Sequence, residues 1–291
     1  MKLVFASCSR LQVVNPQPVW DEIRAERPDA LLLLGDNVYL DRDDHDDAPA
    51  LAAELAQRYA AQLAEPHFAA LRADLRTRGA ALLVGCDDHD FLGNDRCGGD
   101  FPVALREAAR TELIRAFDPP RTGDELHASL RLGPVRVVML DTRFHRRAAA
   151  VSAADPDAVL GAAQWAWLEA ELARRDTPFV VVASSSTVHA WRGEAWEHYP
   201  AAFARLRGRL RGRPGALVVA GDIHANGMYD DSGIVELVSS GVARRGAVFG
   251  GERRNFGVLD FDADGVSVNL RSNKPGDRLS ARIALDDWAL R

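Results

Sequence analysis

Short apolar runs rich in valine and leucine alternate with longer stretches of helical periodicity from the N-terminus to about residue 223. The short runs are bounded by Gly, Asp or Pro and have the length of buried strands, and their alternation with helices is typical of a layered α/β fold. We expect strands at 2–6, 30–34, 80–84, 135–140, 179–183 and 216–220. We expect the clearest helices at 49–64, 66–78, 103–117, 161–175 and 200–211.

Two parts of the chain depart from this alternation. The run at 126–132 is followed by Gly133-Pro134 and then by the strand at 135–140, which predicts a hairpin and therefore a mixed sheet. After Ile223 the helical pattern stops, and the remaining runs predict an antiparallel β tail at 234–239, 256–261, 266–270 and 281–285. Two sheets packed between layers of helices would accommodate both halves. The alanine-rich 148–154 and the acidic 41–47 are expected surface loops.

The composition is that of one large domain. With 291 residues, of which 47% are hydrophobic, we expect a single domain over residues 1–291. A formal net charge of −6, from 42 acidic and 36 basic residues, provides no general attraction to nucleic acid or to an anionic membrane. Any phosphate must therefore be bound by local contacts. No stretch approaches the roughly 18 to 20 apolar residues of a membrane span.

The cysteines and the N-terminus indicate a reducing compartment. Cys8, Cys86 and Cys97 are odd in number and form no regular disulfide framework. The apolar run at 1–6 is too short for a signal peptide, because it passes directly into Ser7 and Cys8. We therefore expect a cytoplasmic protein.

Polar side chains follow each of the six expected strands. In open α/β sheets, ligands bind outside the carboxyl ends of the strands, so clusters that lie far apart in the sequence should meet in one crevice. A single Gly-Asp pair at a strand end is commonly only turn chemistry, but four strand ends with metal-binding side chains favour a shared site. The clusters are Ser7-Cys8-Ser9, Gly35-Asp36-Asn37-Val38-Tyr39, Asp87-Asp88-His89-Asp90, Asp141-Thr142-Arg143, Ser184-Ser185-Ser186 and Gly221-Asp222-Ile223-His224.

These clusters resemble, in their order, the motifs of the PhoD-like metallophosphatases, which are alkaline phosphatases and phosphodiesterases of the calcineurin-like superfamily. The resemblance extends over nearly the whole chain. It implies a four-layer α/β/β/α fold with mixed sheets, a binuclear metal centre and hydrolysis of small phosphate esters. Further similar stretches are Asn94-Asp95, Gly161-x-x-Gln164-x-x-Trp167-Leu168, Glu236-Leu237-x-Ser239-Ser240-Gly241 and Asn255-Phe256-Gly257.

The donor atoms divide into two predicted metal sites. Asp36 is the expected bridging carboxylate, because paired metals about 3.5 to 4 Å apart need an anionic oxygen between them. A thiolate and a phenolate together favour iron(III) at the first site, which we assign to Cys8, Tyr39 and His224 with Asp36. The second site has mostly oxygen donors, which suit calcium, magnesium or manganese. We assign it to Asp88 and Asp222, joined by Asn94.

Three further residues are expected to take part in catalysis. In related enzymes the histidine after the second-metal ligand contacts the phosphoryl group and protonates the leaving oxygen, and His89 occupies that place. Asp87 or Asp90 could accept a hydrogen bond from its ring and fix the tautomer. Arg143 could bind two phosphate oxygens with its guanidinium, although an Asp-x-Arg at a strand end is equally consistent with a structural ion pair.

Other polar and aromatic residues have plainer interpretations. Cys86 and Cys97 read as small buried hydrophobes. The arginines of 205–213 read as the solvated side of a helix, because Leu206 and Leu210 are spaced for its buried side. Ser184, Ser185 and Ser186 are expected to line the pocket. Trp191, Trp196 and Tyr199 could stack on a nucleobase or cover the core. Surface or packing roles are expected for His45, His67, His127, His145, His189 and His198.

The predicted reaction is in-line attack on phosphorus by a metal-bridging hydroxide, with no covalent enzyme intermediate. None of the three serines after the fifth strand has the glycine-flanked elbow that a nucleophilic serine requires. The alternative is a non-catalytic metal- or phosphate-binding protein on the same fold, since a fold does not imply turnover. Selectivity is expected to come from the loops at 41–48, 96–101 and 188–199.

Overall fold

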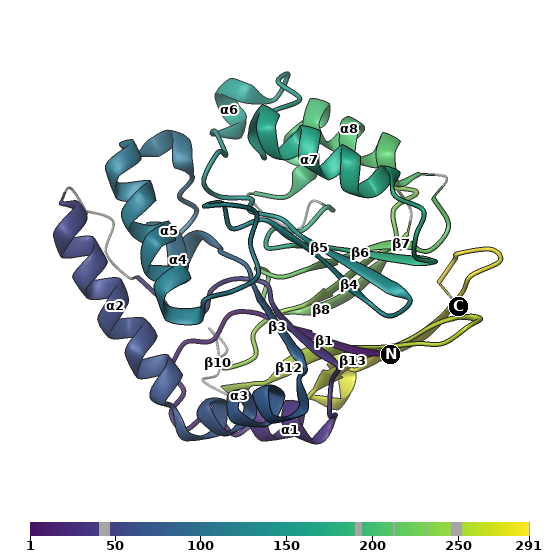
Figure 1. Ribbon diagram of the computed structural model, residues 1–291, viewed down its shortest axis with the longest axis horizontal. Helices are drawn as coiled ribbons and strands as arrows, with labels where there is room; N and C mark the ends of the chain where they lie inside the picture. The colour runs from purple at the N-terminus through teal and green to yellow at the C-terminus, as the bar shows by residue number, and fades with distance from the viewer. Residues whose placement is uncertain (41–46, 190–193, 212, 231, 246–251, 291) are drawn as a thin grey trace.

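The protein is a four-layer α/β/β/α sandwich in which two six-stranded sheets pack face to face between helices (Figure 1). This computed structural model describes residues 1–40, 47–189, 194–211, 213–230, 232–245 and 252–290. The expected fold class is confirmed. Over these residues, no helix is both long and apolar enough to cross a membrane.

The first sheet has the strand order β14-β13-β12-β1-β2-β3. Its parallel half consists of β1 (Lys2–Ala6), β2 (Ala30–Leu33) and β3 (Ala81–Val84). The β tail supplies its antiparallel half with β12 (Asn255–Phe261), β13 (Gly265–Ser272) and β14 (Leu279–Ala284). The two halves of the chain therefore share one sheet, with β1 in the middle between β12 and β2.

The second sheet has the order β4-β5-β6-β7-β9-β8. The strands β4 (Ala128–Leu132) and β5 (Val135–Met139) form the predicted hairpin, which turns at Gly133 with a positive φ of 54°. The strands β6 (Phe179–Ser184), β7 (Ala216–Ala220) and β9 (Glu236–Ser239) continue it in parallel. Only β8 (Asn226–Tyr229) pairs antiparallel to β9.

The expectation of a wholly antiparallel tail is therefore wrong at β9. The apolar residues of β9 identify a buried strand, but the direction of pairing depends on the strand beside it. Here β8 forms the sheet edge, and β9 returns between β8 and β7, which makes it parallel to β7.

The strands in the middle of both sheets are buried on both faces, which explains why they read as continuous apolar runs. In β1, Leu3 and Phe5 face the other sheet, whereas Val4 and Ala6 face the helices. The alternation in β6 is the same, since Val181 and Ala183 join the central core while the neighbouring valines contact the outer helices. One apolar layer thus lies between the sheets, and another lies under each helix layer.

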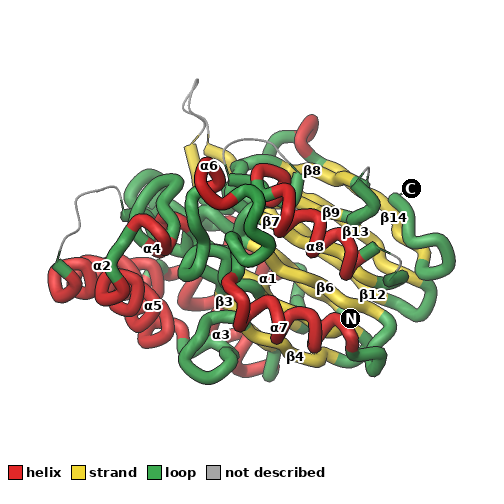
Figure 2. Tube along the Cα trace, turned by 90° about the horizontal axis from the view of Figure 1, so that it is seen from above, coloured by secondary structure: helices red, strands yellow, loops and turns green. Residues whose placement is uncertain are grey.

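The helices divide into two groups, one for each sheet. Those over the first sheet are α1 (Val19–Ala25), α2 (Ala48–Ala64), α3 (Pro66–Arg78) and α5 (Val103–Phe117). Those over the second sheet are α7 (Gly161–Ala173) and α8 (Pro200–Leu210), and Figure 2 shows them lying over its strands. The bounds of α3 follow from its sequence, because Glu65 accepts from the Phe68 amide at 2.7 Å and Gly79 ends the helix at φ 67°.

Several elements were not expected, among them the helix α1 and the strand β8. The others are α4 (Asp88–Phe91), α6 (Ala149–Ser152), the 3₁₀ turns Gly98–Asp100, Trp196–His198 and Pro275–Asp277, and the strand pair β10 (Arg244–Arg245) and β11 (Glu252–Arg253). The alanine-rich surface loop expected at 148–154 thus contains a single helical turn. The acidic loop expected at 41–47 lies mostly outside the described residues.

Candidate metal centre

The loops after β1, β2, β7 and β9 meet at one edge of the two sheets, and the sulfur of Cys8 lies 3.9 Å from the carbonyl oxygen of Asp222 in the loop after β7. The amide of Cys8 donates to the carbonyl of Gly35 at 3.2 Å, and the amide of Ser9 donates to the carbonyl of Asp36 at 2.9 Å. The amide of Gly241, beyond β9, donates to the carbonyl of Ser7 at 3.1 Å. Backbone hydrogen bonds therefore join loops that come from both sheets.

Four side chains at this edge stand on strained backbone. Cys8, Asp36, Asp222 and His224 have positive φ values of 64°, 52°, 72° and 54°. Each such conformation costs roughly 1 kcal/mol or more for a residue with a Cβ, and it persists where the surroundings hold it. Such strain is concentrated at functional sites. The four residues are among those that the sequence assigned to metals.

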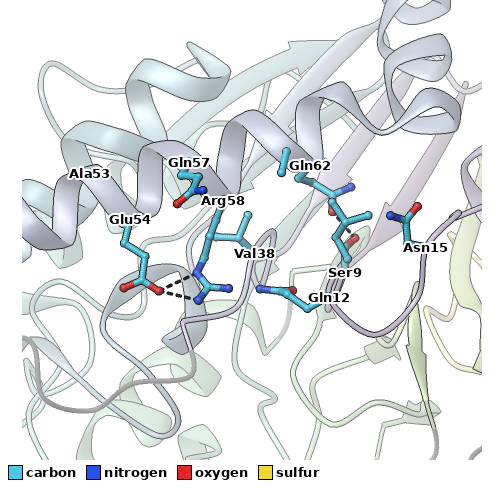
Figure 3. A pocket seen from close by; sticks show the side chains of 11 residues that line it. Ser9, Gln12, Asn15, Val38, Ala53, Glu54, Gln57, Arg58 and Gln62 are labelled. Atoms are coloured by element: carbon cyan, nitrogen blue, oxygen red, sulfur yellow. Dashed lines mark hydrogen bonds and ion pairs between the residues drawn. The ribbon is translucent and has the colours of Figure 1, made fainter.

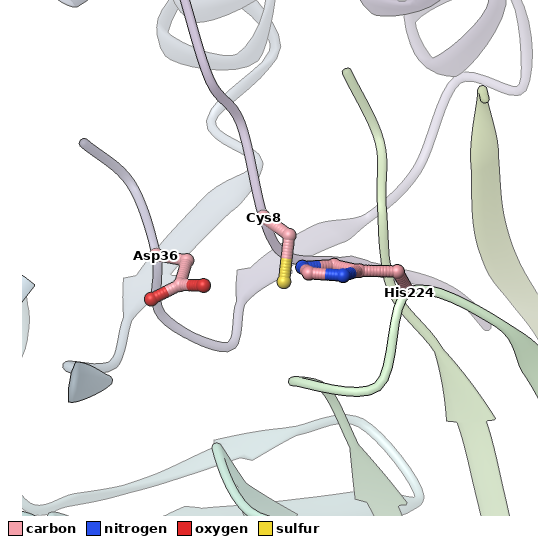
Figure 4. A group of neighbouring side chains, drawn as sticks. All are labelled: Cys8, Asp36 and His224. Atoms are coloured by element: carbon pink, nitrogen blue, oxygen red, sulfur yellow. The ribbon is translucent and has the colours of Figure 1, made fainter. Parts of the chain in front are cut away.

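Cys8, Asp36 and His224 form a compact group (Figure 4). The sulfur of Cys8, a carboxylate oxygen of Asp36 and a ring nitrogen of His224 lie within 4.8 Å of one another. Tyr39 is buried beside them and donates its hydroxyl to Oδ2 of Asp36 at 2.7 Å. Nε2 of His224 is buried and has no hydrogen-bond partner among the described residues. This donor set fits a transition metal, because it combines a thiol, a carboxylate and a phenol with an imidazole nitrogen that has no hydrogen-bond partner among the described residues.

The same group resists ionisation in the absence of a cation. Burial raises the pKa of Cys8 well above its usual value, and the charge of Asp36 raises it further. The pKa of Tyr39 is raised for the same two reasons, and that of Asp36 is raised by burial and then by Asp88. Burial and Arg244 lower the pKa of His224 to about 3, so its ring is neutral and able to donate a lone pair. A bound cation would offset the cost of the buried anions.

Asp36 also belongs to a second group, with Asp88 and His89. A carboxylate shared by two groups is the arrangement that a bridging ligand requires. Asp222 is half-buried, and its pKa is raised first by burial and then by the charges of Asp87 and Asp88. Its side chain therefore lies in the field of the same carboxylates.

A third group consists of Asp88, Asp95 and Glu194, whose carboxylate oxygens lie within 4.8 Å of one another. The amide of Asp95 donates to Oδ2 of Asp88 at 2.7 Å. Sequence reasoning named the neighbouring Asn94, which is exposed here, and did not name Glu194. The Asn94-Asp95 pair pointed to the right loop, but no motif pointed to Glu194.

The ring of His89 is held by a backbone carbonyl. Its Nδ1 lies 3.2 Å from the carbonyl oxygen of Leu40, and its centroid lies 4.1 Å from that of the Tyr39 ring. The expectation that Asp87 or Asp90 holds this ring is therefore wrong. Because a carbonyl oxygen only accepts, Nδ1 carries a proton, and Nε2 is the nitrogen available to a ligand.

Asp90 instead fixes the loop that bears Asp36 and Tyr39. It is fully buried and accepts from the amides of Asn37 at 2.9 Å and Val38 at 3.2 Å, and from the hydroxyl of Tyr59 at 3.2 Å. Burial raises its pKa to about 7 in spite of these hydrogen bonds. Its part in the site is to position the loop.

Asp87 and Arg143 form a buried ion pair. Their side chains are 1% and 0% exposed, and Nε of Arg143 donates to Oδ1 of Asp87 at 2.7 Å. The guanidinium also pairs with Glu194 and donates to the carbonyl of Arg96 at 3.2 Å. Burial raises the pKa of Asp87 to about 6, although Arg143 opposes the shift. These contacts are those of a structural ion pair, one of the two roles that the sequence left open for Arg143. A contact of Arg143 with phosphate stays a prediction.

The serines and aromatic residues near β6 are packed inside. Ser184, Ser185 and Ser186 are buried, and Ser184 accepts from the indole of Trp196 at 3.2 Å. Trp196 and Tyr199 are also buried, as the core interpretation has it. Trp191 lies outside the described residues.

Two arginines of α8 are paired with acidic side chains. Arg205 pairs with Asp157 and Glu169, and Arg209 pairs with Glu169. Acidic partners thus neutralise two arginines of the helix, as expected of a solvated helix face, whereas Arg213 beyond the helix is buried and donates to the carbonyl of Arg174 at 2.8 Å.

The histidines outside the motifs mostly have packing or ion-pair contacts. His67 pairs with Asp21, His145 lies near Glu125, and His127 packs on Trp167. His189 pairs with the buried Glu236. His45 lies outside the described residues.

A cavity of about 780 Å³ lies between α2 and the loop after β1 (Figure 3). Its wall is partly apolar, and its polar part includes Gln12, Gln57 and the ion pair of Glu54 and Arg58. Nε2 of Gln12 donates to the carbonyl of Tyr39 at 3.1 Å, which connects the wall to the loop that bears the candidate metal ligands Asp36 and Tyr39. Sequence reasoning placed selectivity in other loops, of which 41–46 and 190–193 lie outside the described residues.

Comparison with known proteins shows the fold and the family of the chain. Among solved structures, PhoD superposes with a TM-score of 0.75 at 18% identity, over 100% of this chain and 71% of that one. GAP50, described as the anchor in the inner membrane complex of Plasmodium, superposes with a TM-score of 0.56 at 14% identity, over 98% of this chain and 89% of that one. No curated protein sequence matches significantly. The model of the PhoD-like phosphatases matches residues 3–255, and the chain therefore belongs to the PhoD-like phosphatase family.

Proposed function

We propose that the protein hydrolyses small phosphate esters, as a phosphomonoesterase or phosphodiesterase, at a binuclear metal centre. The observation that supports this most directly is the position of Asp36, whose carboxylate belongs both to the group with Cys8 and His224 and to the group with Asp88 and His89. Membership of a phosphatase family supports the reaction class.

In this proposal the two sites hold different metals. Iron(III) would be bound by Cys8, Tyr39, Asp36 and His224, because thiolate and phenolate donors favour it. Calcium, magnesium or manganese would be bound by the oxygen donors Asp36, Asp88, Asp222 and Asn94. When bound, the two metals would supply Lewis acidity and would lower the pKa of water, so that hydroxide is available as the nucleophile near neutral pH.

The protein's own contribution to the reaction centres on His89. Its Nδ1 proton is held by the Leu40 carbonyl, so a second proton at Nε2 could be given to the leaving oxygen. The backbone amide of His89 donates to carboxylate oxygens of Asp88 at 2.9 Å and of Asp36 at 3.3 Å. These bonds place the ring next to both candidate metal ligands. The ion pairs of Arg143 with Asp87 and Glu194 hold the segment that precedes His89.

Release of p-nitrophenol from mono- and bis-p-nitrophenyl phosphate tests the proposal. The protein, shown by metal analysis to contain two ions per chain, should turn over at least one of the two esters. A fully metal-loaded protein with no turnover of either ester would favour the alternative, a non-catalytic metal- or phosphate-binding protein on this fold.

We further propose that residues 1–291 form one catalytic domain that works in a reducing compartment such as the cytoplasm. All three cysteines are free and buried, which suits such a compartment. We expect a small phosphate ester as the ligand and neither a nucleic acid nor a membrane, because the net charge is −6 and because acidic partners neutralise Arg205 and Arg209 of α8.

A further inference from the structure

Two arginines from distant parts of the chain pack on the ring of Tyr39. Cζ of Arg10 lies 5.2 Å from the ring centroid, and Cζ of Arg244 lies 4.9 Å from it. Both distances are within the range of cation–π attraction. The ring of His89 also contacts Tyr39, at 4.1 Å between centroids. The phenol is therefore a common neighbour of the candidate general acid and of two guanidinium groups.

The backbone fixes these arginines relative to Cys8. Ser9 and Ala243 form an isolated parallel β-bridge, and the amide of Arg10 donates to the carbonyl of Ala243 at 3.0 Å. Arg244 follows at once and pairs with Arg253 in the short ladder of β10 and β11. Both arginines thus lie on backbone segments that are hydrogen-bonded next to Cys8, a member of the first group of candidate metal ligands.

Arg244 has hydrogen-bonding capacity that the described residues do not use. Its Nη2 lies 3.5 Å from Nδ1 of His224, at the limit of a hydrogen bond. Its Nη1 is buried and has no hydrogen-bond partner in the described part of the chain. None of the described acidic side chains forms a salt bridge with Arg244, whereas Arg143 is paired with both Asp87 and Glu194.

A partly buried cation without an acidic partner is costly unless an anion completes it. The site that it borders is the one for which we propose a phosphate ester. Guanidinium groups bind phosphate with two parallel hydrogen bonds, which gives them both strength and orientation. The geometry therefore favours an anionic oxygen of the ligand as the missing partner.

We propose that Arg244, with Arg10 beside it, binds nonbridging oxygens of the substrate phosphate and makes the site select dianionic phosphate monoesters over monoanionic diesters. This inference rests on the proposed function. The added positive charge interacts more strongly with a group that carries two negative charges. Arg143, which sequence reasoning put forward for this contact, is occupied by its ion pairs.

The experiment compares Arg244→Gln, Arg244→Lys and Arg10→Gln with wild type. The matched control is Arg207→Gln, which removes an arginine that packs on Phe203 in α8. Calorimetry measures the affinity of metal-loaded protein for inorganic phosphate, and kcat/KM is measured for mono- and bis-p-nitrophenyl phosphate. Metal analysis accompanies each variant.

Arg244→Gln should weaken phosphate binding by roughly 10- to 100-fold and lower kcat/KM more for the monoester than for the diester, with metal content unchanged. The phosphate affinity of Arg244→Lys should lie between those of wild type and Arg244→Gln, because lysine keeps the positive charge but cannot donate two parallel hydrogen bonds. Arg10→Gln should weaken binding by a smaller factor, and Arg207→Gln should not change it.

Phosphate affinity within about twofold of wild type in metal-replete Arg244→Gln would overturn the proposal. If Arg244→Gln loses its metals or does not fold, the test uses Arg244→Lys instead. Wild-type phosphate affinity in Arg244→Lys would then overturn the proposal. Failure of the proposed function gives a different result, because wild type would then turn over neither ester. Calorimetry would still measure how much Arg244 contributes to phosphate affinity in that case.

Discussion

Replacing Arg143 distinguishes a structural ion pair from a phosphate-binding role, because the guanidinium is completely buried against Asp87 and Glu194. Arg143→Gln keeps a polar side chain but removes the charge, which leaves two carboxylates without their shared partner. Removing one member of a buried ion pair costs about 3 to 5 kcal/mol, since the remaining charge stays desolvated. We expect the free energy of unfolding to fall by about that amount. For a chain of this size, Tm should fall by roughly 5 to 8 °C.

Thermal unfolding of metal-loaded and chelator-treated protein measures this effect, and treatment with chelator separates loss of the ion pair from loss of metal. Arg143→Gln combined with Asp87→Asn should lose less stability than the sum of the two single variants, with a coupling of about 1 to 3 kcal/mol. A partial recovery of this kind would identify the pair itself as the cause.

The phosphate-binding alternative makes the opposite prediction. If Arg143 chiefly serves the substrate, Arg143→Gln should keep Tm within about 1 °C of wild type while KM rises and phosphate inhibits less. That combination would refute the structural interpretation of Arg143.

Three further predictions concern the proposed metal centre. His89→Asn should lower kcat by roughly 10² to 10⁴ with both metals bound, and near wild-type turnover would remove His89 from the mechanism. Asp36→Ala should deplete both metals and abolish activity, whereas Asp222→Ala should mainly empty the oxygen-rich site; two metals per chain in Asp36→Ala would show that Asp36 is not the bridge. Iron-loaded protein should absorb visible light, and Tyr39→Phe and Cys8→Ser should each alter that band. A colourless active enzyme with only zinc, manganese or magnesium would contradict the iron assignment and leave the phosphoesterase proposal standing.

The candidate site shows why some ligands can be found in the sequence and others cannot. Cys8, Asp36 and His224 each follow a strand whose apolar run is easy to recognise, and the carboxyl ends of parallel strands converge. Glu194 has no such position, since it lies in a long connection after β6. Its place beside Asp88 and Asp95 depends on how that connection folds back over the site.

The partners of catalytic side chains were also out of reach of the sequence. Two acidic residues flank His89 in sequence, yet its ring contacts the carbonyl of Leu40, 49 positions away. Every residue has a backbone carbonyl, so a sequence gives no signal for one that acts as an acceptor. The pairing of Arg10 and Arg244 on Tyr39 likewise depends on a single bridge between Ser9 and Ala243.

The sequence by itself determined the local elements, the burial of the strands and the strand ends that bear chemistry. It could do so because apolar runs, periodicity and capping are local, as in the apolar run of β1 and the helix between Glu65 and Gly79. The tertiary structure alone decided the parallel pairing of β9 and the ion pairs of Arg143, because these depend on which strand and which loop the sheet order places alongside. Burial then fixes such partners, since a charge removed from water must find its counter-charge nearby.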